Sequence, residues 1–200
     1  MIAEPICQIC GLPIERAGLC SNCEQTPPLY KMLRSWLIFE GPIRSALHTL
    51  KYRRNLPLGD SLAQQMAPYV RAWNWPIDIV VPVPLGRKRM RERGYNQVAL
   101  VAMPLAALNG WQYRPRALVR SRETRSQVGL NAEERRQNVA DAFYAKPADV
   151  SGKVVLLMDD VATTGATLSA CTEALKKAGA REVYALTIAR ALPHHGLHIV

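Results

Sequence analysis

Short apolar runs alternate with longer amphipathic stretches along most of this 200-residue chain. The apolar runs are predicted to form strands, over residues 34–39, 77–83, 154–158 and 182–188. Apolar residues spaced three and four apart predict helices, over residues 41–54, 60–73, 95–108 and 166–178. Because the strands alternate with helices, we predict an α/β fold whose parallel sheet is covered by helices on both faces.

Turn-forming residues predict where these elements end. We expect the break between the first two helices to come from three residues, Asn55, Pro57 and Gly59. Residues 86–94 are rich in arginine and glycine and are predicted as a basic loop. Asn131 and Glu134 have the spacing of a capping box, which predicts a short helix after them.

The composition is that of a globular protein, because 48% of the residues are hydrophobic and 21% are charged. Every apolar run is shorter than the roughly 18 residues that span a bilayer. The first residues lack the basic segment followed by an apolar stretch that marks a signal peptide. We therefore expect a cytoplasmic protein without membrane insertion.

Positive charge is concentrated in one part of the chain. The formal net charge is +10, and the segment 87–136 alone holds 12 basic and four acidic residues. Such a region attracts polyanions, either nucleic acid or a small polyphosphate. A solubilising surface is the alternative. Nearly all of these cations are arginines, whose planar fork matches phosphate oxygens, and this favours an anion site.

Four of the five cysteines lie close together, at Cys7, Cys10, Cys20 and Cys23. In each C-x2-C pair both thiolates point to one side of a turn, and two facing pairs make a tetrahedral site suited to Zn²⁺. Two disulfides are one alternative, which the lack of a secretory signal disfavours, and two redox motifs are another. We predict a structural zinc knuckle with its linker over residues 1–28, followed by one domain over residues 29–200.

The segment 154–169 carries the candidate chemistry. An apolar strand leads to two adjacent carboxylates, Asp159 and Asp160, and a Thr-Thr-Gly sequence then leads directly into a helix. The start of that helix suits a phosphate, because its first backbone N–H groups have no partner within the helix. Ionised carboxylates accept hydrogen bonds from a sugar diol. Together these features describe a ribose 5-phosphate site. The alternative is a pair of acids at a strand end that makes caps or metal contacts without a substrate.

Residues 155–167 resemble the phosphoribosyl pyrophosphate (PRPP) motif of type I phosphoribosyltransferases. The whole chain resembles the ComF/GntX family, competence-associated proteins in which a zinc knuckle precedes such a domain. Further matching segments follow in order along the chain, at Leu50 to Tyr52, Val81 to Pro84, Arg93 to Gln97, Thr124 to Gln127 and Glu134 to Asn138. The resemblance implies the type I phosphoribosyltransferase-like fold.

The resemblance also implies a role for each matching position. Asp159 and Asp160 would hold the ribose hydroxyls, and together with Arg87 they are the candidate catalytic residues. The 5-phosphate would lie in a cradle formed by Ala162, Thr163, Thr164, Gly165 and Thr167. The pyrophosphate and its Mg²⁺ would lie at a turn formed by Leu85, Gly86 and Arg87. Its charge would be met by Arg89, Arg91 and Arg93. Residues 120–137 would form a lid over the site.

Two functions from different classes follow. In the first, the protein is an enzyme that binds Mg-PRPP and transfers or processes its phosphoribosyl group, in DNA uptake or in nucleotide metabolism. Nothing in the sequence indicates the acceptor. In the second, it is an adaptor that binds PRPP or a nucleotide without turnover and binds single-stranded DNA during natural transformation, alongside proteins of the competence machinery. The basic stretch would then follow the DNA phosphates.

Overall fold

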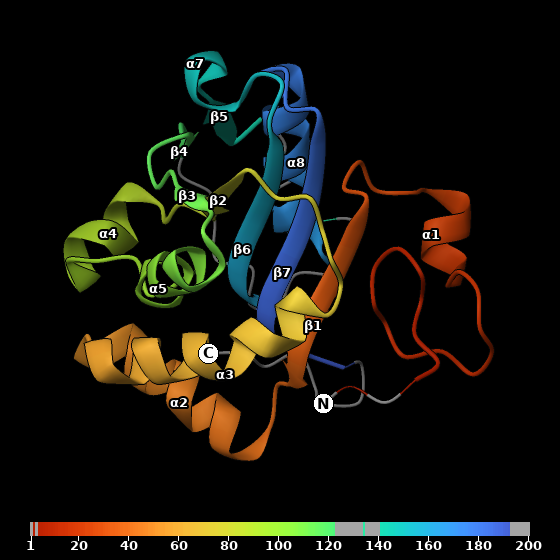
Figure 1. Ribbon diagram of the computed structural model, residues 1–200, viewed down its shortest axis with the longest axis horizontal. Coiled ribbons are helices and arrows are strands. Elements are labelled where there is room, and N and C mark those ends of the chain that lie inside the picture. The colour runs from red at the N-terminus through yellow and green to blue at the C-terminus, as the bar shows by residue number, and fades with distance from the viewer. Residues whose placement is uncertain (1, 3, 123–133, 135–140, 193–200) are drawn as a thin grey trace.

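Five parallel strands form the central sheet of the computed structural model, which describes residues 2, 4–122, 134 and 141–192. The strands stand in the order β1-β7-β6-β2-β3, as Figure 1 shows for the longer ones. Their bounds are β1 Met32–Ile38, β2 Ile79–Pro82, β3 Gln112–Tyr113, β6 Val154–Ala162 and β7 Glu182–Arg190. The predicted α/β fold with a parallel sheet is confirmed.

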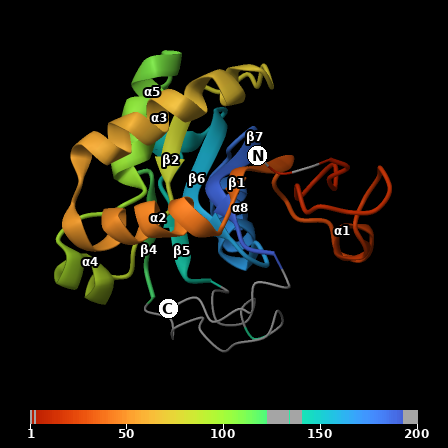
Figure 2. The ribbon, with the colours of Figure 1, turned by 90° about the horizontal axis from the view of Figure 1, so that it is seen from below.

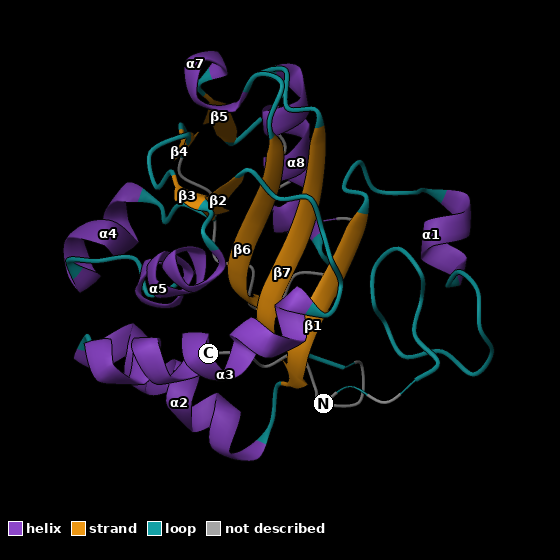
Figure 3. Ribbon diagram, in the orientation of Figure 1, coloured by secondary structure: helices purple, strands orange, loops and turns teal. Residues whose placement is uncertain are grey.

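Helices cover both faces of this sheet (Figure 3). On one face, apolar side chains of the sheet pack against α2 (Gly41–Arg53), α3 (Leu56–Arg71) and α5 (Ala99–Asn109). The other face packs against α8 (Ala166–Lys177) and the antiparallel pair β4 (Leu118–Arg120) and β5 (Phe143–Ala145). The remaining described helices are α1 (Ser21–Gln25), α4 (Arg87–Arg93) and α7 (Pro147–Val150). Both hydrophobic layers therefore depend on the apolar strands β6 and β7.

The boundary between α2 and α3 differs from the prediction. Arg54, in the left-handed region at φ 40°, ends α2. Asn55 begins α3 instead of breaking it, because its side chain accepts a hydrogen bond from a backbone N–H three residues later at 3.0 Å. Pro57 lies in the first turn, where its missing N–H costs little. Gly59 permits close packing on α5, since a Cβ there would lie 2.5 Å from the carbonyl oxygen of Leu100.

The prediction of a basic loop over residues 86–94 was wrong, because most of this segment is the helix α4. Gly86 precedes the helix, and Gly94 ends it in the left-handed region at φ 75°. No residue of α4 is buried, so the arginines and one lysine of this helix face solvent along most of its length. Without a buried stripe, the helical period leaves no apolar signal in the sequence.

Strand β6 is longer than predicted and contains both aspartates, since it continues through Ala162 before the chain turns. The predicted helix after Asn131 and most of the lid over residues 120–137 lie outside the described residues. Within the described part of the chain, no helix is long and apolar enough to cross a membrane.

Residues 4–28, which we call the cysteine knuckle, lie beside the outer edge of β1 (Figure 1, red). The knuckle contains the short helix α1 and two isolated bridges, Ile6 with Pro13 and Cys7 with Gly18. Its four cysteines form a small buried cluster of their own. The structure thus has a cysteine cluster at the N-terminus of a parallel-sheet α/β fold.

Candidate functional site

The C-terminal ends of β2, β6 and β7 lie side by side at one edge of the sheet. Figure 2 views the molecule from the side of this edge. Beyond β2, the backbone N–H of Val83 donates to the carbonyl of Met158 at 2.8 Å. Beyond β7, the N–H of Ala191 donates to the carbonyl of Ala162 at 2.9 Å. These bonds hold the segments that follow β2 and β7 against the C-terminal half of β6. In open parallel sheets this edge is where ligands bind.

Asp160 is held by two side chains that come from distant parts of the sequence. The Lys51 ammonium, near the end of α2, lies 3.1 Å from Oδ2 of Asp160. The Gln97 amide, between α4 and α5, donates to the same oxygen at 3.1 Å. Asp160 is only 9% exposed, so it is a buried carboxylate whose charge is paired with that of Lys51. Both residues lie in segments that match the ComF/GntX family, but the sequence alone implied no role for either of them.

The two aspartates have opposite pKa shifts. Burial raises the pKa of Asp159 well above its ordinary value, and the negative charge of Asp160 raises it further. Burial also disfavours the charge of Asp160, but the Lys51 ammonium and hydrogen bonds from Lys51 and Gln97 outweigh it and lower the pKa of Asp160. Asp160 therefore carries the negative charge of the pair, and Asp159 takes up a proton first as the pH falls.

The segment 93–97 ties the neighbouring elements to this carboxylate. The Arg93 guanidinium donates to Oε1 of Gln97, which orients the amide so that its NH₂ group faces Asp160. Asn96 donates to the carbonyl of Val83 at 2.9 Å, and the Tyr95 hydroxyl donates to the carbonyl of Leu50 at 2.7 Å. This segment therefore links α2, the chain after β2 and the acid pair.

The turn after β6, residues 162–165, is called the Thr-Gly turn below. Gly165 adopts the left-handed region at φ 80° and precedes the first residue of α8. The Thr164 side chain is exposed, and its hydroxyl accepts a 3.4 Å hydrogen bond from the N–H of Ala166. Thr163 and Thr167 are partly buried beside it, whereas Gly165 is buried. The turn thus presents hydroxyls and the N-terminus of a 12-residue helix at the same sheet edge as the aspartates.

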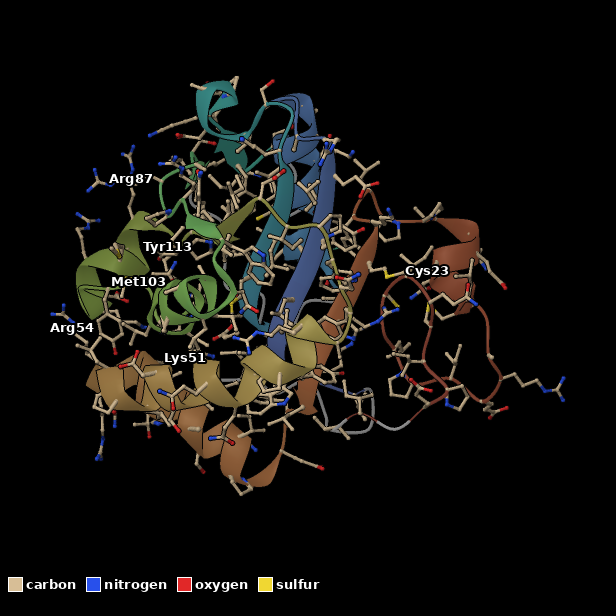
Figure 4. The ribbon with its side chains drawn as sticks, in the orientation of Figure 1. Cys23, Lys51, Arg54, Arg87, Met103 and Tyr113 are labelled. Carbon is tan, nitrogen blue, oxygen red and sulfur yellow. The ribbon has the colours of Figure 1, made fainter. Side chains whose placement is uncertain are left out.

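The four arginines predicted to bind the pyrophosphate differ in their exposure to solvent. Arg87, Arg89 and Arg91 are exposed on α4, whereas Arg93 is partly buried and contacts Gln97. Leu85 and Gly86 lie in the short connection between β2 and α4, separated from the end of β2 by two residues. Figure 4 shows Arg87 projecting from the same side of the molecule as Arg54, opposite to Cys23. The structure thus connects Arg93 to Asp160 through Gln97 and places the other three on the surface.

The four knuckle cysteines form a set of ligands suited to a metal ion. Their sulfur atoms all lie within 4.8 Å of one another, and Sγ of Cys10 lies 3.6 Å from Sγ of Cys20. Sulfurs bound tetrahedrally at about 2.3 Å from Zn²⁺ are about 3.8 Å apart, so this spacing fits such an ion. All five cysteines of the chain are free, which contradicts the alternative of two disulfides.

Hydrogen bonds from the backbone prepare one of these thiols for ionisation. Burial by itself raises the pKa of Cys7, but backbone hydrogen bonds from Cys10, Cys20 and Ile9 lower it to about 6. Burial raises the pKa of Cys10 to about 11 and that of Cys23 still further. Four closely spaced thiols cannot all ionise without a cation, and a bound metal ion supplies that charge.

These features define a phosphoribosyltransferase-type protein, and the chain belongs to this family, because the model of the phosphoribosyl transferase domain matches residues 56–195. It is 33% identical over 193 residues to DNA utilization protein YhgH of Salmonella typhi, which covers 94% of this chain and 85% of that protein. It is 31% identical over 196 residues to Competence protein F of Haemophilus influenzae, which covers 94% and 85%. The resemblance to the ComF family is thereby confirmed.

A solved phosphoribosyltransferase from Corynebacterium diphtheriae is similar at 18% identity, over 77% of this chain and 98% of that one, with a TM-score of 0.41.

Proposed function

We propose that the chain binds Mg-PRPP at the edge formed by β2 and β6 and transfers or processes its phosphoribosyl group. The observation that carries this proposal is the meeting of the acid pair, the Thr-Gly turn and the chain after β2 at one sheet edge. The names of the relatives, a competence protein and a DNA utilization protein, support a role connected with DNA uptake.

The acids suit the ribose hydroxyls, because carboxylate oxygens accept hydrogen bonds from hydroxyl donors. A carboxylate offers about four lone-pair sites. Oδ1 of Asp160 accepts from the N–H of Val161 at 2.9 Å, and Oδ2 accepts from Lys51 and Gln97. Oδ1 of Asp159 accepts from the N–H of Asp160 at 2.8 Å. The two carboxyl groups also hydrogen-bond to each other, and the ribose hydroxyls would take the place of that contact.

The remaining groups of the ligand fall to the neighbouring segments. The Thr-Gly turn and Thr167 would receive the 5-phosphate on N–H and hydroxyl donors. The pyrophosphate would lie over Leu85 and Gly86, with Arg87 nearby. Mg²⁺ would arrive with the pyrophosphate and neutralise charge on the leaving group. The positive charges of Arg89, Arg91 and Arg93 on α4 would further stabilise the negative charge of the pyrophosphate.

The decisive test is calorimetry with PRPP and Mg²⁺. Wild-type protein should bind, and Asp160→Asn should weaken binding by about tenfold or more, since it removes an ionised acceptor. Asp60→Asn, which removes an exposed carboxylate on α3, is the matched control for net charge and should bind as wild type. Absence of magnesium-dependent heat in wild-type protein would refute the proposal. A pyrophosphate assay with and without nucleobases then separates transfer from binding.

A second function is favoured by one surface, the exposed face of α4 with the end of α2. Tyr52 is 60% exposed, and the Arg93 guanidinium lies over its ring at 5.5 Å. An exposed aromatic ring beside arginines is the arrangement on which single-stranded nucleic acid stacks. We therefore propose binding of single-stranded DNA as the alternative or accompanying activity.

Fluorescence anisotropy with a labelled oligonucleotide tests this surface. Arg89→Gln with Arg91→Gln should weaken binding and reduce its salt dependence, because two phosphate contacts are lost. Lys176→Gln with Lys177→Gln removes equal charge from α8, on the opposite face of the sheet, and should have little effect. Equal losses in both double variants would show attraction by net charge alone and would exclude a specific surface.

We also propose that the knuckle holds Zn²⁺, because four buried sulfur ligands at tetrahedral spacing suit this soft-ligand ion. All four positions of the metal are then occupied by sulfur, so the ion stabilises the fold and takes no part in the reaction. Metal analysis of the purified protein should find one zinc per chain, and Cys20→Ser should abolish it.

A further inference from the structure

The cysteine knuckle is attached to the first strand of the sheet by several backbone contacts. The N–H of Leu33 donates to the carbonyl of Ile9 at 2.7 Å, and the Arg34 guanidinium donates to the carbonyl of Gln8 at 2.9 Å. Gly11 packs so closely that a Cβ would lie 2.6 Å from the carbonyl oxygen of Leu33. The knuckle therefore packs against the edge strand β1 as a fitted part of the structure.

One buried arginine connects the cysteine cluster to the strand edge. Arg190 ends β7 and is only 3% exposed, and it pairs in register with Ala162, the first residue of the Thr-Gly turn. Its Nη1 donates to the carbonyl of Cys10 at 3.0 Å, and its Nη2 lies 4.0 Å from Sγ of Cys10. The next residue, Ala191, donates its N–H to the carbonyl of Ala162. The residue that contacts Cys10 and the residue that contacts the turn are therefore adjacent in the sequence.

A buried tyrosine forms the second connection. Tyr30 lies between the knuckle and β1 and is 4% exposed. Its hydroxyl oxygen lies 3.3 Å from the position that a Cβ of Gly165 would occupy. Burial and the nearby cysteine sulfurs raise the pKa of Tyr30, so it remains a neutral phenol against the turn. A side chain at position 165 would press against the Tyr30 hydroxyl.

The charge of Arg190 makes this connection dependent on the cluster. A buried guanidinium is unfavourable unless an anionic group lies near it. Four thiolates around one divalent ion carry a net negative charge, which supplies that partner, whereas the cluster without the ion holds fewer thiolates. The Nε atom of Arg190 has no hydrogen-bond partner among the described residues, so the guanidinium depends mainly on Cys10.

We propose that the metal-loaded cysteine cluster sets the position of the Thr-Gly turn through Arg190 and Tyr30, which act as positioning residues for that turn. The conformational coupling stands on the contacts above, and only its consequence for ligand binding rests on the proposed function. The knuckle then has a second role beyond its own folding, because loss of the metal loosens a turn at the sheet edge and weakens binding there.

Hydrogen–deuterium exchange of the full chain tests the coupling without any ligand. Removal of the metal with a chelator should speed exchange of amides in residues 162–169 by about tenfold, while α5, residues 99–109, stays unchanged as an internal reference. Arg190→Gln, with the metal still bound, should give the same change in the turn. Tyr30→Phe, which removes only the hydroxyl, should give a smaller change in the same peptides.

Arg34→Gln is the matched control, because Arg34 also donates to the knuckle but pairs in register with Leu186, four residues before Arg190. It should leave exchange in the turn unchanged. Unchanged exchange after both chelation and Arg190→Gln would overturn the proposal, as would an equal effect of Arg34→Gln. If Arg190→Gln does not fold, Arg190→Lys, which keeps the charge and loses the fork, replaces it in the same comparison.

Calorimetry with PRPP separates this proposal from the proposed function. If the wild-type protein binds no PRPP but exchange still responds to the metal, the coupling holds and the assigned ligand is wrong. If the wild-type protein binds PRPP and chelation changes neither exchange nor affinity, the ligand is right and the coupling is refuted.

Discussion

The cysteine knuckle and the strand-edge site are two clusters of ionisable groups that reach charge balance in different ways. The knuckle places four thiols within one small cluster, and Arg190 is a cationic group that contacts them among the described residues. The strand edge places two carboxyl groups together and supplies Lys51 and Gln97 from the protein itself. The knuckle is therefore suited to a metal ion as its source of positive charge, whereas the charge of Asp160 is balanced by Lys51 from within the protein.

The largest expected effect comes from removing a metal ligand. Cys23→Ser should release the metal and lower the free energy of unfolding by about 4 kcal/mol, because binding of a structural ion contributes directly to folding. Metal analysis and thermal unfolding measure this effect. Cys171→Ala is the control: it removes a buried thiol on α8 far from the cluster in sequence, and it should keep the metal. Retention of metal in Cys23→Ser would contradict the four-sulfur site.

Next in size is the contact between the knuckle and β1. Gly11→Ala should destabilise the protein by about 2–3 kcal/mol, because the left-handed φ of 65° and the contact with Leu33 both oppose a side chain. Chemical denaturation measures the change. Gly18→Ala is matched, since Gly18 also has a positive φ, of 147°, but has nothing within 4 Å of the added Cβ. An equal loss in both variants would show that backbone strain, and not contact with β1, decides the effect.

At the strand edge, Asp160→Asn should lower stability by about 1–2 kcal/mol at neutral pH, because Lys51 loses its anionic partner. The pKa of Asp160 is lowered in the folded protein, so its contribution is present above the ordinary aspartate pKa. That contribution is lost as the pH falls through the lowered value. Denaturation curves of wild type and variant should therefore converge in acid, and a constant gap at all pH values would contradict this origin.

The smallest expected effect has the opposite sign. The folded-state pKa of Asp159 is raised, so its ionised form opposes folding at neutral pH, and Asp159→Asn should stabilise the protein by about 1 kcal/mol. This gain should shrink as the pH falls and the native carboxyl takes up its proton. The same variant should bind PRPP less well if the acid pair holds the ribose. A loss of stability in Asp159→Asn would mean that its carboxylate is favourably paired.

Local order in the sequence was sufficient for much of the fold and for part of the site. Apolar runs located four strands of the sheet to within a few residues at most ends, because strands buried on both faces are strongly apolar. The start of α8 after the Thr-Gly sequence was also predicted correctly. The helix α4 was missed because it buries nothing, and α3 was shortened because Pro57 and Gly59 look like breakers where they serve as a first turn and a packing contact.

What the sequence by itself determined is the chemistry of groups that are neighbours along the chain. Two C-x2-C pairs and two aspartates before a Thr-Gly turn need only local backbone geometry to come together. Only the tertiary structure decided that Lys51 from α2 neutralises Asp160 and that Gln97, 63 residues before it, donates to the same carboxylate. The same holds for the contact of Arg190 with Cys10 across 180 residues. Such pairs depend on how helices and sheet edges pack, and no local pattern records that packing.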